Sequence, residues 1–132
     1  MRILIVDDER NVTDTLALIL KHAGHDVRCA YSSAAALALL DSFAPECAIC
    51  DLILAGVNGV DMCASLAAAR PDCRIILSSA QSEASPLVQD ARARGFTWEL
   101  LVKPQDPAEL LKKMASLESA LRSSGAHVCC GA

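Results

Sequence analysis

The sequence predicts an α/β fold in which five strands alternate with five helices, a (βα)5 pattern. Short apolar runs alternate with longer stretches in which apolar residues recur at helical spacing. The segments between them are short, and strand–helix–strand units joined in this way form a doubly wound parallel sheet with helices on both faces. With 132 residues, 53% of them hydrophobic, the chain is long enough to bury the core of one domain.

Four of the five predicted strands are short apolar runs, and the second is predicted because Val27 and Cys29 alternate with polar residues and share one face. The five strands lie at residues 2–6, 26–30, 47–50, 73–78 and 100–102. The five predicted helices are amphipathic or rich in alanine and leucine. They lie at residues 9–23, 32–43, 60–69, 86–95 and 107–121.

Turn-forming and capping residues mark the ends of these helices. Gly24 ends the first helix, and Ser32 or Ser33 caps the second. The third follows a loop at residues 55–59 that contains two glycines. Pro86 and Pro107 stand in the first turns of the fourth and fifth helices, where proline is well tolerated.

The first and last helices carry clear apolar series. In the first, the residues at helical spacing are Val12, Leu16, Ile19, Leu20 and Ala23. In the last, the residues expected on the buried stripe are Leu110, Leu111, Met114, Leu117 and Leu121. We expect a single domain over residues 1–121. Residues 122–132 are small and polar, which predicts a disordered tail or the start of a linker.

The composition excludes several classes of protein. The net charge of −4 and the pI of about 5.2 argue against direct nucleic-acid binding, which draws on a basic surface. The apolar runs are shorter than the roughly 18–20 residues of a membrane span, so we expect no membrane insertion and a cytoplasmic location. The seven cysteines are then expected to be free thiols. Cys47 and Cys50 form a C-x-x-C pattern, but they lie in a predicted strand and are expected to be packing residues.

Polar side chains follow four of the predicted strands. They are Asp7 and Asp8 after the first strand, Asp51 after the third, Ser78 and Ser79 at the end of the fourth, and Lys103 after the fifth. The carboxyl ends of parallel strands open at one edge of a sheet, so groups far apart in the sequence meet in one crevice. The sequence therefore predicts a single site with three carboxylates, a hydroxyl group and an ammonium group.

This combination of groups suits phosphoryl transfer. Carboxylates that converge raise each other's pKa unless a cation lies among them, and Mg²⁺ prefers such oxygen ligands, with Mn²⁺ as a substitute. A carboxylate can also act as a nucleophile and form an aspartyl phosphate. The ammonium group of Lys103 is suited to share the charge of the phosphoryl oxygens, and the Ser79 hydroxyl is suited to donate to one of them.

These motifs, Asp7-Asp8, Asp51, Ser79-Ala80 and Lys103-Pro104, resemble those of the receiver domain of bacterial two-component response regulators. The resemblance covers residues 1–121. It implies a flavodoxin-like sheet with strand order 2-1-3-4-5. It also implies that a sensor histidine kinase or histidine phosphotransfer protein donates the phosphoryl group, and that the chain is a signalling switch rather than an enzyme. The output partner is not implied, and a monomer or weak dimer is expected.

The resemblance also assigns roles to individual residues. Asp51 is the implied phosphoacceptor, Ser79 the switch hydroxyl and Lys103 the phosphate-pairing cation. The implied Mg²⁺ ligands are Asp7, Asp8, Asp51 and the backbone carbonyl of Ile53.

Three points stay open at this level. Ser78 competes with Ser79, which is preferred because Ala80 follows it and because alternation along a strand turns Ser78 toward a face of the sheet. Leu100 stands where related domains commonly carry an aromatic residue, which leaves the route of the signal open. The alternative functions are a small phosphatase with an aspartyl nucleophile and a pseudo-receiver that is never phosphorylated.

Overall fold

The structure is a computed structural model. It describes residues 1–54, 57–80, 82, 85–103 and 106–131, and for residues 54, 57 and 123–131 it describes the backbone alone. Within these ranges, no helix is both long enough and apolar enough to cross a membrane.

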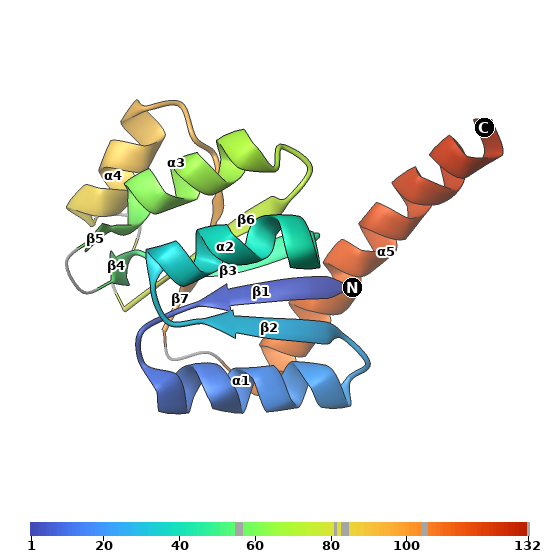
Figure 1. The fold of residues 1–132 in the computed structure, drawn as a ribbon, viewed down its shortest axis with the longest axis horizontal. Helices are drawn as coiled ribbons and strands as arrows, with labels where there is room; N and C mark the ends of the chain where they lie inside the picture. The colour runs from blue at the N-terminus through green and yellow to red at the C-terminus, as the bar shows by residue number, and fades with distance from the viewer. Residues whose placement is uncertain (55–56, 81, 83–84, 104–105, 132) are drawn as a thin grey trace.

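Five parallel strands form the central sheet (Figure 1). They are β1 (Arg2–Val6), β2 (Asp26–Ala30), β3 (Cys47–Asp51), β6 (Arg74–Ser79) and β7 (Glu99–Val102). Their order across the sheet is β2-β1-β3-β6-β7, which is the predicted order 2-1-3-4-5 when only these five strands are counted. The fold class predicted from the sequence is therefore confirmed.

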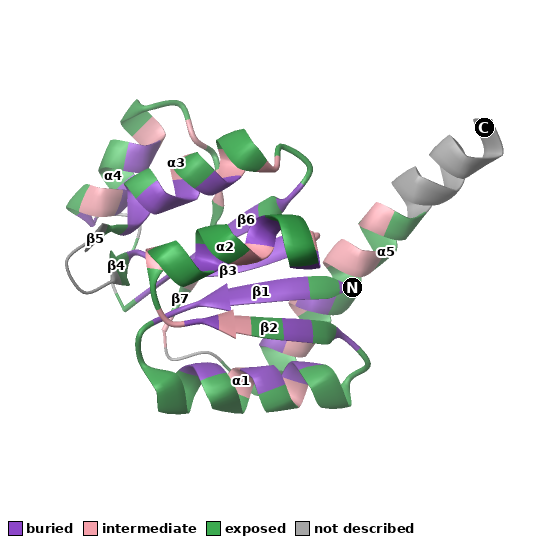
Figure 2. Ribbon diagram, in the orientation of Figure 1, coloured by how far each residue is buried: buried purple, intermediate pink, exposed green. Residues whose placement is uncertain are grey.

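Helices cover both faces of this sheet (Figure 1). They are α1 (Arg10–His22), α2 (Ser33–Phe43), α3 (Gly59–Ala69), α4 (Pro86–Ala93) and α5 (Pro107–Gly131). Buried residues of α1 and α5 pack on one face of the sheet, and buried residues of α2, α3 and α4 pack on the other. The central strands β1, β3 and β6 are consequently buried on both sides along most of their length, as Figure 2 shows, which is why they read as apolar runs in the sequence. The edge strands β2 and β7 are only partly buried.

The strand β1 illustrates how strongly this core holds the sheet. The residues from Ile3 to Val6 are at most 2% exposed. Burial of an aliphatic side chain of this size contributes about 1.5–3 kcal/mol. Because β1 lies between β2 and β3 and pairs with both, its register sets where the carboxyl ends of the two neighbouring strands lie relative to its own. Val6 pairs with Ala30 on one side and with Cys50 on the other.

Several element ends match their sequence signals. Ser32, rather than Ser33, caps α2, since its side chain accepts a hydrogen bond of 3.1 Å from the backbone N–H of Ala35. Asn58, for which no capping role was predicted, caps α3 in the same way, by accepting a 2.8 Å bond from the N–H of Val60. Of the predicted buried stripe on α5, Leu110 and Met114 are fully enclosed, while the remaining three leucines are partly buried against the same core.

The structure differs from the sequence prediction at three places. The sequence predicts a loop at residues 55–59, but residues 57 and 58 form the short strand β5 (Val57–Asn58), which pairs antiparallel with β4 (Ile53–Leu54), and Gly59 begins α3. Residues 55 and 56 lie outside the described chain. The helix α5 continues to Gly131 instead of ending near residue 121. A division into a domain at residues 1–121 and a tail stays a prediction.

The third difference concerns which residues of α1 are buried. The buried positions are Thr13, Ala17 and Leu20, whereas Val12 is 40% exposed. The apolar series in the sequence is therefore rotated relative to the face that packs on the sheet. The physical reason is that a small residue at 17 and a hydrogen-bonded threonine at 13 allow α1 to approach the sheet closely, which leaves larger apolar side chains beside the contact.

The C-x-x-C pattern behaves as packing rather than as a redox pair. Cys47 and Cys50 are both fully buried, and they belong to the cores on opposite faces of the sheet. Burial raises the pKa of the Cys47 thiol to about 12, so this thiol stays protonated at neutral pH. All five cysteines whose side chains the structure describes are free.

Candidate functional site

Three carboxylates meet at the carboxyl edge of the sheet. Asp7 directly follows β1, Asp8 follows it, and Asp51 is the last residue of β3. One carboxylate oxygen from each of the three lies within 4.8 Å of the others. Asp7 and Asp51 are buried, whereas Asp8 is exposed. The sequence prediction that these acids come together is therefore met by the geometry.

Backbone hydrogen bonds hold the two buried carboxylates in place. The N–H of Glu9 donates to Asp7 Oδ1 at 3.0 Å, and the N–H of Ile53 donates to Asp51 Oδ1 at 3.1 Å. The N–H of Asp7 itself donates to the carbonyl oxygen of Ala30 at the end of β2. Each carboxylate is thus oriented by the loop that follows its own strand.

Lys103, which directly follows the edge strand β7, contacts the two buried carboxylates. Its Nζ lies 2.8 Å from Asp7 Oδ2 and 3.2 Å from Asp51 Oδ2. Its backbone N–H donates to the carbonyl oxygen of Ser79 at 2.7 Å, which ties the end of β7 to the end of β6. From this anchored backbone the side chain reaches past the end of β6 to the ends of β3 and β1.

The electrostatics of the site follow from burial and from this ion pair. Burial raises the pKa of the Asp51 carboxyl above its ordinary value; the hydrogen bond from Ile53 and the charge of Lys103 oppose the rise, and the like charge of Asp7 adds to it. Burial lowers the pKa of Lys103, but its hydrogen bond to Asp7 and the charges of both carboxylates outweigh that effect and raise it. Lys103 is therefore an ammonium ion at neutral pH.

The two candidate serines lie side by side at the end of β6, and both are buried. In the register of the parallel strands, Ser78 lies beside Asp51 of the neighbouring strand β3, and Ser79 lies beside Val102 of the neighbouring strand β7. Because side chains alternate along a strand, Ser78 lies on the same face as Ile76, which packs with α1 and α5, and Ser79 lies on the opposite face. The choice of Ser79 over Ser78 as the switch hydroxyl stays a prediction.

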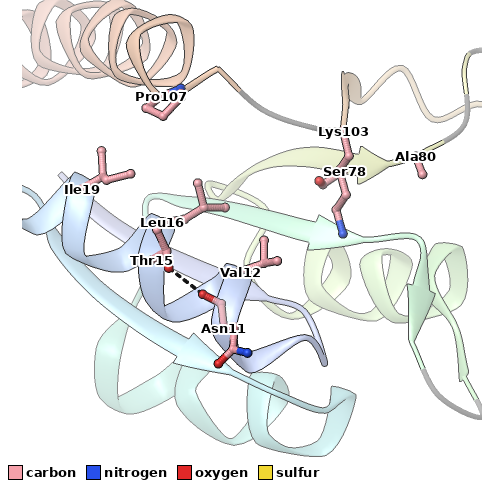
Figure 3. A pocket seen from close by; sticks show the side chains of 9 residues that line it. All are labelled: Asn11, Val12, Thr15, Leu16, Ile19, Ser78, Ala80, Lys103 and Pro107. Carbon is pink, nitrogen blue, oxygen red and sulfur yellow. Dashed lines mark hydrogen bonds between the residues drawn. The ribbon is translucent and has the colours of Figure 1, made fainter.

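An apolar groove that the sequence did not predict opens beside Lys103 (Figure 3). Its volume is about 640 Å³. It lies between α1 and the start of α5, and it ends at the polar site. Its lining residues are Asn11, Val12, Thr15, Leu16, Ile19, Ser78, Ala80, Lys103 and Pro107. The rotated series on α1 supplies its apolar wall, and that rotation is set by packing against the sheet and not by a local sequence pattern.

Comparison with known proteins agrees with this geometry. The pattern of the response regulator receiver domain family matches residues 3–115. The chain belongs to the response regulator receiver domain family. The response regulator MprA of Mycobacterium avium is 32% identical to this receiver domain over 119 residues, which cover 89% of the chain and 50% of the relative. MprA of Mycobacterium tuberculosis is 31% identical with the same coverage. The chain thus spans about half the length of the curated relatives that it matches.

Solved structures share the fold of this receiver domain. The response regulator TrrA of Thermotoga maritima, solved in complex with Mg²⁺ and BeF, is 28% identical with a TM-score of 0.73; the match covers 88% of this chain and 97% of that one. A CheY-like receiver domain protein of Methanospirillum hungatei reaches a TM-score of 0.81 over 92% of this chain and 97% of its own, at 24% identity. This chain is therefore a domain of the phosphorylation-switched signalling type found in two-component systems.

The position of the expected aromatic residue is filled by Leu100. In this receiver domain Leu100 is half-buried and packs against the core on the side of α2, α3 and α4. Phe96 and Trp98 pack against the same core, and their rings are stacked with centroids 4.1 Å apart. The aromatic surface near β7 is thus displaced toward the amino end of the strand, away from the carboxylates.

Proposed function

We propose that this receiver domain accepts a phosphoryl group on Asp51, with Mg²⁺ bound beside it. The donor is a phosphohistidine on a sensor histidine kinase or a histidine phosphotransfer protein. The observation that carries the proposal is the Lys103 ammonium group, which lies within hydrogen-bonding distance of both Asp7 and Asp51. A cation in this place is positioned to pair with a phosphoryl oxygen on Asp51.

The charge of the site supports a divalent ion. Three carboxylates and one ammonium group leave two uncompensated negative charges when all four are ionised. A divalent cation balances this charge, and a donor set made of oxygen atoms suits Mg²⁺ or Mn²⁺. We assign Asp7, Asp8 and Asp51 as ligands. The backbone carbonyl of Ile53 is a further proposed ligand, because the N–H of the same residue already binds Asp51.

The reaction follows from the nucleophilic character of a carboxylate. An oxygen of Asp51 attacks phosphorus and forms an acyl phosphate, while the phosphorus–nitrogen bond to the donor imidazole breaks and the imidazole nitrogen keeps the electron pair. When bound, Mg²⁺ supplies compensation for the charge of the phosphoryl oxygens. Lys103 then moves its hydrogen bond from Asp51 to a phosphoryl oxygen, and the Ser79 hydroxyl donates to another. Hydrolysis of the acyl phosphate resets the switch.

This chemistry makes the domain a switch and not a turnover enzyme. Transfer to Asp51 and the later hydrolysis are the only covalent steps proposed for it. Signalling then depends on which partner binds the phosphorylated form. A cytoplasmic location belongs to the same proposal, because it would expose the site to such a donor.

Phosphorylation by a small donor tests the proposal directly. The protein is incubated with MgCl₂ and acetyl phosphate, and its intact mass is measured beside that of the Asp51→Asn variant. We expect one added phosphoryl group on the wild-type protein and none on the variant. An unmodified wild-type protein would instead support the pseudo-receiver. Steady hydrolysis of a phosphate ester that is lost in Asp8→Asn but retained in Asp51→Asn would support the phosphatase.

A further inference from the structure

The short antiparallel strands β4 and β5 connect the end of β3 to α3 (Figure 1). β4 begins two residues after Asp51, and Ile53 lies opposite Asn58 in its register with β5. At the next position, the Gly59 N–H donates to the carbonyl oxygen of Leu52 at 3.0 Å. Because hydrogen-bonded and non-hydrogen-bonded pairs alternate along an antiparallel ladder, Ile53 and Asn58 form a non-hydrogen-bonded pair. The backbone N–H and C=O of Ile53 therefore point away from β5.

The side of Ile53 that points away from β5 faces the acidic cluster. In an extended strand, the N–H and C=O of one residue point to the same side, since two residues of a bonded pair exchange both bonds. The N–H of Ile53 donates to Asp51 Oδ1 at 3.1 Å, so the carbonyl group of Ile53 lies on the side of Asp51 as well. Whatever fixes the pairing of β4 with β5 therefore also fixes the direction of this carbonyl group.

Asn58 is the residue at which this pairing and the start of α3 are held together. Its backbone belongs to β5, and its side-chain Oδ1 caps α3 by accepting a 2.8 Å bond from the N–H of Val60. Gly59, which stands between these two residues, carries the bond to Leu52. Val60 and Cys63 are fully buried, so the core holds the first turns of α3 in place. The cap therefore ties β5 to an anchored helix.

We propose that Asn58 is a positioning residue for the carbonyl group of Ile53 at the metal site. Its side chain fixes the first turn of α3, and the Gly59 N–H of that turn holds Leu52. The resulting pairing keeps the Ile53 carbonyl group on the side of Asp51. Groups that orient a metal ligand without touching the metal commonly influence metal affinity. The inference rests on the proposed function, because it concerns the same metal site.

The chain offers a matched control for this cap. Ser32 caps α2 by accepting a 3.1 Å bond from the N–H of Ala35, and the side chains of Ser32 and Asn58 are both exposed. The helix α2 follows β2, which carries none of the three carboxylates. An alanine at either position removes a capping oxygen without opening a cavity in the core. Both variants should lose similar stability, so a difference in metal binding reports on β4 and β5.

Direct measurement of metal binding tests the proposal. Mn²⁺ is titrated into each folded protein, and the free ion is measured by electron paramagnetic resonance. Asn58→Ala should bind Mn²⁺ about tenfold more weakly than the wild type, as expected for a group that supports a metal ligand. Asn58→Ser, which keeps a capping oxygen, and Ser32→Ala should both bind within about twofold of the wild type. Should Asn58→Ala fail to fold by circular dichroism, Asn58→Gly is measured in its place, because glycine removes the oxygen at a smaller cost to the helix.

The outcomes separate this inference from the function on which it rests. Equal Mn²⁺ affinity of the folded Asn58 variant and the wild type would overturn the positioning role and leave the metal site intact. An equal loss in Ser32→Ala would also overturn it, because the effect would then follow from lower stability in general. Binding by Asn58→Ser as weak as that of Asn58→Ala would overturn the role of the capping oxygen. A wild-type protein that binds no Mn²⁺ would overturn the metal site together with this inference.

Phosphorylation by acetyl phosphate gives a second readout. Asn58→Ala should raise the Mg²⁺ concentration for half-maximal phosphorylation and keep the maximal rate, because the displaced group is a metal ligand and not the nucleophile. A lower maximal rate with an unchanged Mg²⁺ dependence would contradict the proposal.

Discussion

Replacing Gly59 with alanine probes the closest backbone approach next to the site. Gly59 is the first residue of α3, and its N–H donates to the carbonyl oxygen of Leu52 at 3.0 Å. A Cβ atom at this position would lie 2.3 Å from that oxygen and 2.6 Å from the carbonyl carbon and Cα of Leu52. These are main-chain atoms, so no rotamer change relieves the overlap. Leu52 directly follows Asp51, and we expect its displacement to move the phosphoacceptor.

The expected loss of stability combines three contributions. Overpacking of a buried position costs about 1–3 kcal/mol. The lost backbone hydrogen bond costs about 1 kcal/mol. The smaller conformational entropy of alanine in the unfolded chain offsets about 0.4–1 kcal/mol. Gly59→Ala should therefore destabilise the fold by about 2 kcal/mol.

Urea unfolding followed by circular dichroism measures this loss, and phosphorylation by acetyl phosphate measures the effect on Asp51. We expect a lower urea midpoint and slower phosphorylation of the folded variant. Gly95→Ala is the control: its φ of +89° strains an alanine, but no atom lies within 4 Å of the added Cβ. It should lower stability and leave phosphorylation unchanged. A Gly59→Ala protein with wild-type stability and rate would refute the reasoning.

Three further predictions follow from the charges and thiols of the domain. In Lys103→Met, the pKa of Asp51 should rise further, because the like charge of Asp7 is no longer opposed; carbon-13 NMR of the carboxyl group measures it. A carboxyl group whose pKa is raised in the folded state stabilises the fold when it is protonated, and this stabilisation is lost as it ionises. The urea midpoint of Lys103→Met, compared with that of the wild type, should therefore fall as the pH rises from about 4 toward neutrality. A difference in midpoint that does not change with pH would contradict this. MgCl₂ at one hundred times its dissociation constant should raise the free energy of unfolding of the wild type by about 2.7 kcal/mol, and with it the urea midpoint; both should rise much less in Asp8→Asn. Iodoacetamide at pH 8 should leave Cys47 unmodified until urea unfolds the protein, as peptide mass spectrometry would show, and rapid labelling of the folded protein would contradict its burial.

The core strands and helices were predictable because the pattern that reveals them is local. β1 and β3 are buried on both faces, which leaves runs of apolar residues with polar groups directly after them. The helix boundaries carry capping residues and prolines whose preferences act within a few residues. The pair β4 and β5 lacks such a signal, because two-residue strands are too short to show alternation.

The residues of the candidate site could be predicted from the sequence, but the contacts between their side chains could not. Sequence alone located the acids and Lys103 at strand ends, and parallel pairing placed those ends at one edge. It did not reveal that Lys103 bridges Asp7 and Asp51, contacts that join residues 96 and 52 positions apart.

The sequence by itself determined the (βα)5 order, the family and the chemical groups of the site, because each depends on residue types and spacing along the chain. The tertiary structure alone decided the rotation of α1, the groove beside Lys103 and the close approach of Gly59 to Leu52. These features depend on how near one packed element comes to another, a distance set by the summed volumes of side chains from several elements. No local pattern in the sequence records that sum.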